Sequence, residues 1–150
     1  MFNISKILVP IDFSECSQEA LSYALSLAAQ HGATLEVLHV AEIPSLKGEL
    51  RVATDSGTTS FREYALGAAQ VELAGFLSGL NSADRARISS RVEVGRPRER
   101  ILDRAEHERY DLIVMGTHGR TGRAHLLAGS VAESVVRSAP CPVLTVRGPQ

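Results

Sequence analysis

Several glycines with a defined spacing are the residues of this chain best suited to ligand chemistry. Gly116 and Gly119 stand at the end of an apolar run, and Gly129 and Ser130 follow after nine further residues, where a helix-forming segment begins. Glycine lets the backbone approach a ligand closely, and the free N–H groups at a helix start attract an anion such as phosphate. The spacing therefore predicts a phosphate-binding loop over residues 116–130.

Charged and polar side chains within this loop support the same prediction. Arg120 and Arg123 can donate hydrogen bonds to phosphate oxygens, and a neutral His118 imidazole can hydrogen-bond a ligand bound at the loop. A plainer interpretation is also open at this point, because a long loop needs glycines for its turns and surface arginines and histidines commonly face solvent. The segment matches neither the G-x-x-x-x-G-K-S/T motif nor the G-x-G-x-x-G motif of other phosphate sites.

Asp12 is a second candidate ligand residue, because it directly follows the apolar run 6–11. A carboxylate at the end of a strand can accept hydrogen bonds from two hydroxyl groups of a ligand. Asp12 is equally suited to be a turn residue before Ser14, which can cap the next helix. It could also help to hold a phosphate-bound Mg²⁺, although a single carboxylate is a weak basis for a metal site.

The remaining histidines and the two cysteines predict structural roles. His31 and His39 are expected to be a helix-end residue and a strand residue, since no carboxylate or cysteine stands at metal-ligand spacing from either. Cys16 and Cys141 lie too far apart for a zinc motif, and we interpret them as reduced thiols. Cys141 stands between two prolines, which favours packing over catalysis by a Cys–His pair.

Strand and helix patterns alternate along the chain and would position these residues. Apolar, β-branched runs predict strands, and apolar residues at helical spacing predict the helices between them. The expected strands are residues 6–11, 34–40, 88–94, 112–115 and 143–146, and the expected helices start after Ser14, after the loop 41–57, at Pro97 and at Ser130. Five strands separated by helices predict an α/β fold, a doubly wound five-stranded parallel sheet with helices on both faces.

The segments between these elements complete the prediction. Residues 41–57 follow neither the strand nor the helix period of apolar residues and are expected to form a mobile loop. Residues 98–109 are expected to present a solvated, charged helix face. Ligands of such sheets lie beyond the carboxyl ends of the strands, where the winding direction reverses. The loops after Ile11, Val40 and Met115 are therefore the expected place of a site.

Composition limits the function classes. The chain has 150 residues, 44% of them hydrophobic, which predicts one globular domain, and its 16 Lys+Arg against 17 Asp+Glu give a net charge of -1. A nucleic-acid partner is not expected without an excess of basic residues. The apolar runs are far shorter than the roughly 20 residues of a membrane span, and no secretory signal is apparent. We therefore expect a cytoplasmic protein.

The motifs taken together resemble the universal stress protein family, whose nucleotide-binding members carry Gly-x2-Gly-x9-Gly-Ser/Thr. In this chain that pattern is Gly116, Gly119, Gly129 and Ser130. The resemblance extends over nearly the whole chain and also includes the segments 6–12 with Ser14 and Ser17, 38–40, 111–116 and 138–144. It implies a Rossmann-like, adenine nucleotide alpha hydrolase-like domain over residues 1–150.

The resemblance also implies an ATP site, with Mg²⁺ accompanying the phosphates. In such a site Asp12 binds the ribose, Pro10 and Val40 border the adenine, and the glycine loop holds the phosphates. The residues expected to contact the nucleotide are Pro10, Asp12, Val40, Met115, Gly116, His118, Gly119, Arg120, Gly129, Ser130 and Val131.

Three functions remain open at the level of sequence. The first is a nucleotide-dependent regulatory or stress-tolerance protein, the second a slow ATPase, and the third an interaction protein that binds no nucleotide. No general base for phosphoryl transfer is apparent, which favours binding over catalysis. A homodimer through the last strand, 143–146, is expected because an edge strand offers unpaired N–H and C=O groups; a monomer whose edge is shielded by Arg147 and the nearby prolines is the alternative. A further protein partner is expected but unidentified.

Overall fold

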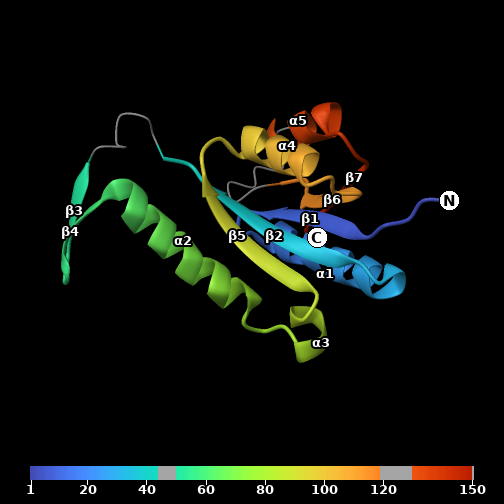
Figure 1. Ribbon diagram of the computed structural model, residues 1–150, viewed down its shortest axis with the longest axis horizontal. Coiled ribbons are helices and arrows are strands. Elements are labelled where there is room, and N and C mark those ends of the chain that lie inside the picture. Colours follow the sequence, from blue (N-terminus) through green and yellow to red (C-terminus); the bar gives the residue numbers. More distant parts are fainter. Residues whose placement is uncertain (44–49, 119–129, 150) are drawn as a thin grey trace.

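A computed structural model describes residues 1–43, 50–118 and 130–149. Its main sheet has five parallel strands in the order β5-β2-β1-β6-β7 (Figure 1). The strands of this sheet are β1 (Lys6–Ile11), β2 (Thr34–Ala41), β5 (Ile88–Val94), β6 (Leu112–Gly116) and β7 (Val143–Val146). Each agrees with a predicted strand to within one residue, and β5 and β7 lie at the two edges.

Helices cover both faces of the sheet, as predicted for a doubly wound fold (Figure 1). The helices are α1 (Glu15–His31), α2 (Phe61–Leu77), α3 (Ser82–Arg85), α4 (Pro97–His107) and α5 (Ser130–Ser138). α1 and α2 pack on one face, and α4 and α5 pack on the other. None of the helices within the described ranges is long and apolar enough to cross a membrane.

The central strand β1 is buried on both faces, which explains its continuous apolar sequence. Ile7, Val9 and Ile11 belong to the cluster under α1 and α2, whereas Leu8 belongs to the cluster under α4 and α5. Full burial of such a side chain contributes about 1.5–3 kcal/mol to folding. The core therefore holds β1 firmly, and with it the residue that follows Ile11.

The order of the strands brings the predicted site loops to one edge of the sheet. β2 lies on one side of β1 and β6 lies on the other, so the winding direction reverses next to β1. Parallel pairing aligns the carboxyl ends of these three strands. The loops after Ile11, Val40 and Met115 therefore meet where a ligand of a doubly wound sheet is expected.

Helix α1 begins and ends as its sequence indicates. Ser14 caps its start, because the Ser14 hydroxyl accepts a hydrogen bond from the Ser17 backbone N–H at 3.2 Å. Gly32 ends it in the left-handed conformation, with φ 68°. The start of α1, next to Asp12, is therefore anchored by local hydrogen bonds.

The segment 41–57 differs from the predicted loop. Residues 51–57 contribute to an antiparallel hairpin of β3 (Arg51–Thr54) and β4 (Gly57–Ser60), while residues 44–49 lie outside the described residues. Four-residue strands are too short to produce a clear period, and the turn residues between them suggested a loop. The next helix, α2, starts at a capping box in which the Ser60 hydroxyl accepts a hydrogen bond from the Glu63 backbone N–H and the Glu63 carboxylate accepts one from the Ser60 backbone N–H. The Thr59 hydroxyl also donates to this carboxylate, and these hydrogen bonds lower the Glu63 pKa.

Two further details depart from the predictions. Helix α2 ends at Leu77 rather than near residue 80, and the short helix α3 follows it. The charged face of α4 is largely exposed, but the Arg104 side chain is only 18% exposed, since its guanidinium pairs with Glu36 of β2. No sequence pattern indicates this pair, because its two members lie far apart along the chain.

Candidate functional site

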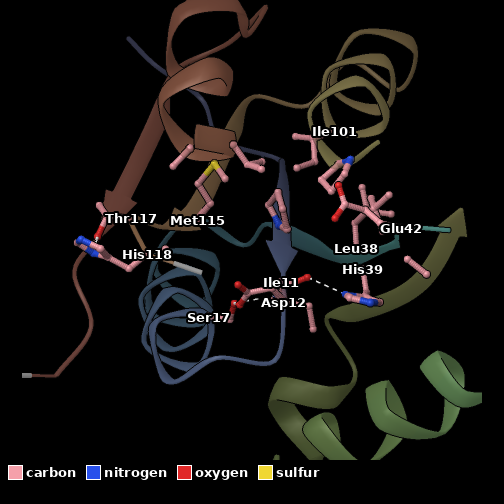
Figure 2. A pocket seen from close by; sticks show the side chains of 17 residues that line it. Ile11, Asp12, Ser17, Leu38, His39, Glu42, Ile101, Met115, Thr117 and His118 are labelled. Carbon is pink, nitrogen blue, oxygen red and sulfur yellow. Dashed lines mark hydrogen bonds between the residues drawn. The ribbon is translucent and has the colours of Figure 1, made fainter. Parts of the chain in front are cut away.

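A cavity of about 490 Å³ opens at the carboxyl ends of β1, β2 and β6 (Figure 2). Its volume falls within the range of roughly 300–1,000 Å³ that small-molecule sites occupy. The predicted site residues that line it are Pro10, Asp12, Val40, Met115, Gly116, His118 and Val131. The structure thus brings together residues from three strands, two loops and α5.

The other predicted site residues precede or begin α5. Gly119, Arg120 and Gly129 lie outside the described residues. Ser130 is the first residue of α5. Because Val131 and Ala132 of the first turn of α5 line the cavity, the start of this helix lies at the cavity wall.

Asp12 is held by the first turn of α1. Its Oδ1 accepts hydrogen bonds from the Ser14 backbone N–H at 3.1 Å, from the Ser14 hydroxyl, and from the Ser17 hydroxyl at 2.7 Å. The Asp12 backbone N–H in turn donates to Ser17 Oγ at 3.0 Å. Asp12 is therefore the turn residue that its position suggested, and it also lines the cavity.

The Ser17 hydroxyl is a site residue whose part in the cavity the sequence did not indicate. It lines the cavity and is 4% exposed. Its spacing of five residues from Asp12 is the signal that could have identified it, since one helical turn after a cap brings a hydroxyl back to the preceding strand end.

One wall of the cavity is apolar and comes from elements distant in sequence. Leu38 and Val40 project from the same face of β2, Ile101 comes from α4, and Met115 and Ala132 come from β6 and α5. All five belong to the buried cluster under α4 and α5. Such a wall suits the flat face of an aromatic base. Ile101 and Ala132 were missed because only the tertiary fold brings them to β2.

The rim of the cavity carries polar groups. Thr117 Oγ1 and His118 Nδ1 lie 2.9 Å apart and share a hydrogen bond, so Thr117 orients the imidazole that was predicted to contact a ligand (Figure 2). Glu42, just beyond β2, also lines the cavity. These groups can exchange hydrogen bonds with polar parts of a ligand at the cavity mouth.

Gly116 is required by packing inside the protein. A Cβ atom on Gly116 would lie 2.8 Å from Cys16 Sγ and 3.1 Å from the Cys16 carbonyl carbon. The Cys16 thiol is buried and donates a hydrogen bond to the Val146 carbonyl oxygen at 3.1 Å. The glycine lets α1 approach β6 and β7 closely, a reason that differs from the close ligand approach predicted from the sequence.

Both cysteines are free, and their surroundings favour packing roles. Cys141 packs against the cluster under α4 and α5, and burial raises the pKa of its thiol. A raised pKa reduces the thiolate population that nucleophilic catalysis requires. His39 is a strand residue, as predicted, but it also lines the cavity, and its Nδ1–H donates to the Ile11 carbonyl oxygen at 2.9 Å.

No group of three or more His, Cys, Asp or Glu side chains within the described ranges is arranged to hold a metal ion. Phosphate oxygens of a bound molecule are suitable ligands for a divalent cation. Among the described residues, Asp12 and Glu42 each contribute a carboxylate to the cavity lining.

Comparisons with known proteins identify the relatives of this chain. The model of the universal stress protein family matches residues 3–147. Universal stress protein MJ0531 of Methanocaldococcus jannaschii is 32% identical over 145 residues, covering 97% of this chain and 83% of the relative. A universal stress protein encoded in the QAH/OAS sulfhydrylase 3′ region of Thermus aquaticus is 36% identical over 142 residues, covering 94% and 97%.

Solved structures share the fold. Universal stress protein UspA from Lactobacillus plantarum superimposes with a TM-score of 0.72 at 25% identity, covering 97% of this chain and 99% of that one. A universal stress protein in complex with cAMP superimposes with a TM-score of 0.62 at 25% identity, covering 98% and 99%. The doubly wound sheet is thus common to these proteins.

Proposed function

Because the chain belongs to the universal stress protein family, we propose that it binds ATP together with Mg²⁺ and acts in the cytoplasm as a nucleotide-dependent regulatory protein of stress tolerance. The cavity at the carboxyl ends of β1, β2 and β6 is the observation that carries this proposal. It combines an apolar wall, an oriented carboxylate and a helix start, which match the base, the sugar and the phosphates of a nucleotide in turn.

The proposed contacts follow from the chemistry of each part of the cavity. The adenine lies against the apolar wall between Pro10 and Val40, next to Met115. The ribose hydroxyls donate to the Asp12 carboxylate, which Ser14 and Ser17 hold in place.

The phosphates lie at Gly116 and at the start of α5, near Val131. We propose that His118, Gly119, Arg120, Gly129 and Ser130 complete this part of the site. Mg²⁺ is held by the phosphates.

A relative that binds cAMP supports an adenine nucleotide and sharpens the choice of ligand. In cAMP the 3′ oxygen is part of the cyclic phosphodiester, so this nucleotide offers Asp12 one ribose hydroxyl where ATP offers two. ATP also carries more negative charge to the start of α5. We therefore expect ATP to bind more tightly than cAMP, which competitive titration of the two nucleotides measures.

Identifying the small molecules released when the purified protein is denatured tests the proposal. Intact ATP supports a binding role, whereas ADP indicates slow hydrolysis on the same site. A protein that releases no nucleotide and also gives no thermal shift with millimolar ATP contradicts the proposal, and it favours an interaction protein that works without nucleotide.

A substitution in the glycine pattern gives a sharper version of this test. Gly129→Val should abolish ATP binding while the fold persists, because a side chain there obstructs the phosphates. Gly67→Val is the matched control, since Gly67 lies on α2, away from the cavity lining, and a Cβ atom added to it would meet nothing within 4 Å. Equal ATP affinity of the Gly129→Val variant and the control would refute the assignment of the loop.

We also propose a homodimer joined through β7. This strand ends one edge of the sheet, and Leu144 on it is 37% exposed. Pairing with a second β7 across a two-fold axis satisfies the edge N–H and C=O groups of both copies.

Leu144→Pro removes a backbone donor and should shift the dimer toward monomer in light scattering, whereas Leu144→Ala keeps the donor and the dimer. A monomeric wild type at all micromolar concentrations contradicts the homodimer.

A further inference from the structure

Phe13, directly after Asp12, has an unusual backbone conformation. Its φ angle is 67°, in the left-handed region that residues other than glycine rarely adopt, and an aromatic side chain there is rarer still. Such strained residues persist where the surrounding structure holds them, and they are concentrated at ligand sites. The contacts of Phe13 therefore indicate what holds this turn.

Two aromatic rings hold the Phe13 side chain. Its ring lies 4.3 Å from the His39 ring, centroid to centroid, with an interplanar angle of 41°. The Phe76 ring of α2 meets it edge-on, at 5.8 Å and 71°. Aromatic pairs at these separations attract each other beyond their burial. Phe13 is thus fixed between β2 and α2.

His39 also holds the other side of Asp12. Its Nδ1 lies 2.9 Å from the Ile11 carbonyl oxygen, the residue opposite it in the β1–β2 register (Figure 2). A carbonyl oxygen only accepts, so Nδ1 carries the proton. This carbonyl belongs to the peptide group that joins Ile11 to Asp12. His39 therefore restrains the peptide before Asp12 by a hydrogen bond and the residue after it by a tilted contact between the two rings.

We propose that His39 is a positioning residue of the nucleotide site, which acts with Phe13 to aim the Asp12 carboxylate at the ribose hydroxyls. The inference rests on the proposed function, because it concerns the same cavity. Hydrogen bonds weaken steeply as their angle departs from linear, so a small rotation of Asp12 costs sugar recognition before it costs the fold. A leucine at position 39 could also occupy the strand, but it has no group that donates a hydrogen bond to the Ile11 carbonyl oxygen.

Two substitutions of His39 separate positioning from packing. His39→Leu replaces the imidazole by an apolar side chain of similar length and removes the Nδ1 donor. His39→Asn supplies an amide N–H where Nδ1 stands, so it restores the hydrogen bond to Ile11 while losing the ring. Phe76→Leu is the matched packing control, because Phe76 touches Phe13 but has no hydrogen bond to the Asp12 turn.

The ratio of the dissociation constants for 2′-deoxy-ATP and ATP is the decisive readout. We expect the wild type to prefer ATP about tenfold or more, the effect of one hydrogen bond to a charged group. His39→Leu should lower this preference to below about twofold, His39→Asn should recover most but not all of it because the ring contact with Phe13 is absent, and Phe76→Leu should keep it. A merely structural role for His39 would change the thermal midpoint and leave the ratio unaltered, and that result overturns the inference.

Two further measurements keep the test decisive if His39→Leu does not fold. Phe13→Gly adopts the left-handed conformation without strain and removes the ring from His39, so it should fold and lose part of the ATP preference. Nitrogen NMR of the wild type without nucleotide should show the His39 Nδ1–H tautomer. A full preference in Phe13→Gly, or the Nε2–H tautomer in the wild type, contradicts the inference.

Failure of the inference differs from failure of the proposed function. A wild type that binds no ATP, or an Asp12→Ala variant that keeps the ATP preference, contradicts the proposed ribose contact itself and removes the basis of the inference. A wild type that prefers ATP and loses this preference with Asp12→Ala, but keeps it with His39→Leu, contradicts only the positioning role of His39.

Discussion

Glu36, within β2, and Asp12, directly after β1, are two carboxylates of neighbouring strands. Glu36 is 8% exposed, and its oxygens accept hydrogen bonds from Arg104 Nε at 2.6 Å and Arg104 Nη2 at 2.8 Å. This forked contact neutralises the carboxylate within the chain, and it raises the pKa of Arg104 so that the guanidinium stays charged. Arg91 adds a second cation 3.8 Å from Glu36.

Asp12 is held in a different way. Ser14 and Ser17 donate to it from hydroxyl groups and a backbone N–H, which are neutral donors that orient the carboxylate. It also lines a cavity, whereas Glu36 is covered by α4. The difference indicates that the Glu36 carboxylate serves folding and that the Asp12 carboxylate is placed where a ligand can reach it.

Removing the cation from the buried pair should have the largest effect. Arg104→Leu leaves Glu36 buried without its forked partner, which should lower the free energy of unfolding by about 3–5 kcal/mol. Urea denaturation measures this loss. The double variant Glu36→Leu with Arg104→Leu should recover most of it, because two apolar side chains replace the pair. A loss below about 1 kcal/mol for the single variant would show that Glu36 is not a structural charge.

The matching change at the other carboxylate should affect binding more than stability. Asp12→Ala should weaken ATP binding by about 1.5–3 kcal/mol, the contribution of hydrogen bonds to a charged group. Calorimetric titration measures the affinity, and thermal unfolding checks the fold. Asp12→Asn is the control, since its amide oxygen can still accept from Ser14 and Ser17. Unchanged ATP affinity in folded Asp12→Ala would remove the contrast with Glu36.

A substitution of Gly116 tests whether packing or ligand approach requires a glycine at the carboxyl end of β6. Gly116→Ala places a methyl group against Cys16 and should lower the free energy of unfolding by about 1–3 kcal/mol. Adding Cys16→Ala removes the nearest atom, Sγ, and should restore part of the stability. If Gly116→Ala keeps full stability and loses only ATP affinity, the glycine is constrained by the ligand and the packing explanation is wrong.

The ionisation of Tyr110, whose pKa depends in part on Glu36, is the prediction with the smallest expected effect. Burial, followed by the charge of Glu36, raises the pKa of Tyr110 to about 12. A tyrosine in the unfolded chain ionises near pH 10. The folded state therefore binds this proton more tightly, and its stabilising effect is present below about pH 10 and is lost as the pH rises to about 12.

The difference between the ultraviolet titration curves of the wild type and the Tyr110→Phe variant isolates the ionisation of the Tyr110 phenol. An ionisation midpoint near pH 10 for the folded protein contradicts the predicted shift, and it would mean that the surroundings of Glu36 are more accessible to water than the structure indicates.

Local patterns were sufficient to predict most of the fold. The apolar run of β1, the Ser14 cap and the Gly32 end each depend on neighbouring residues, so the sequence alone indicates them. The β3–β4 hairpin was missed because its strands are short. The Glu36–Arg104 pair was missed because the fold joins residues that are far apart in sequence.

The candidate site likewise contains residues that local patterns predict and residues that only the tertiary fold brings together. Asp12, Val40 and Met115 stand at strand ends, which the strand pattern already locates. The contributions of Ile101 and His39 depend on which elements pack together, and no local spacing indicates them. Phe13 illustrates the limit most clearly, because its left-handed backbone contradicts the preference of its residue type and its ring is held by tertiary contacts.

Calorimetric titration of the purified protein with ATP in the presence of Mg²⁺ tests nucleotide binding most directly. The cavity, the oriented Asp12 carboxylate and the start of α5 predict one site per chain. We expect a dissociation constant in the micromolar range, which corresponds to a binding free energy of roughly -8 kcal/mol. The complete absence of heat, together with no thermal shift at millimolar ATP, would contradict the proposal that this cavity is a nucleotide site.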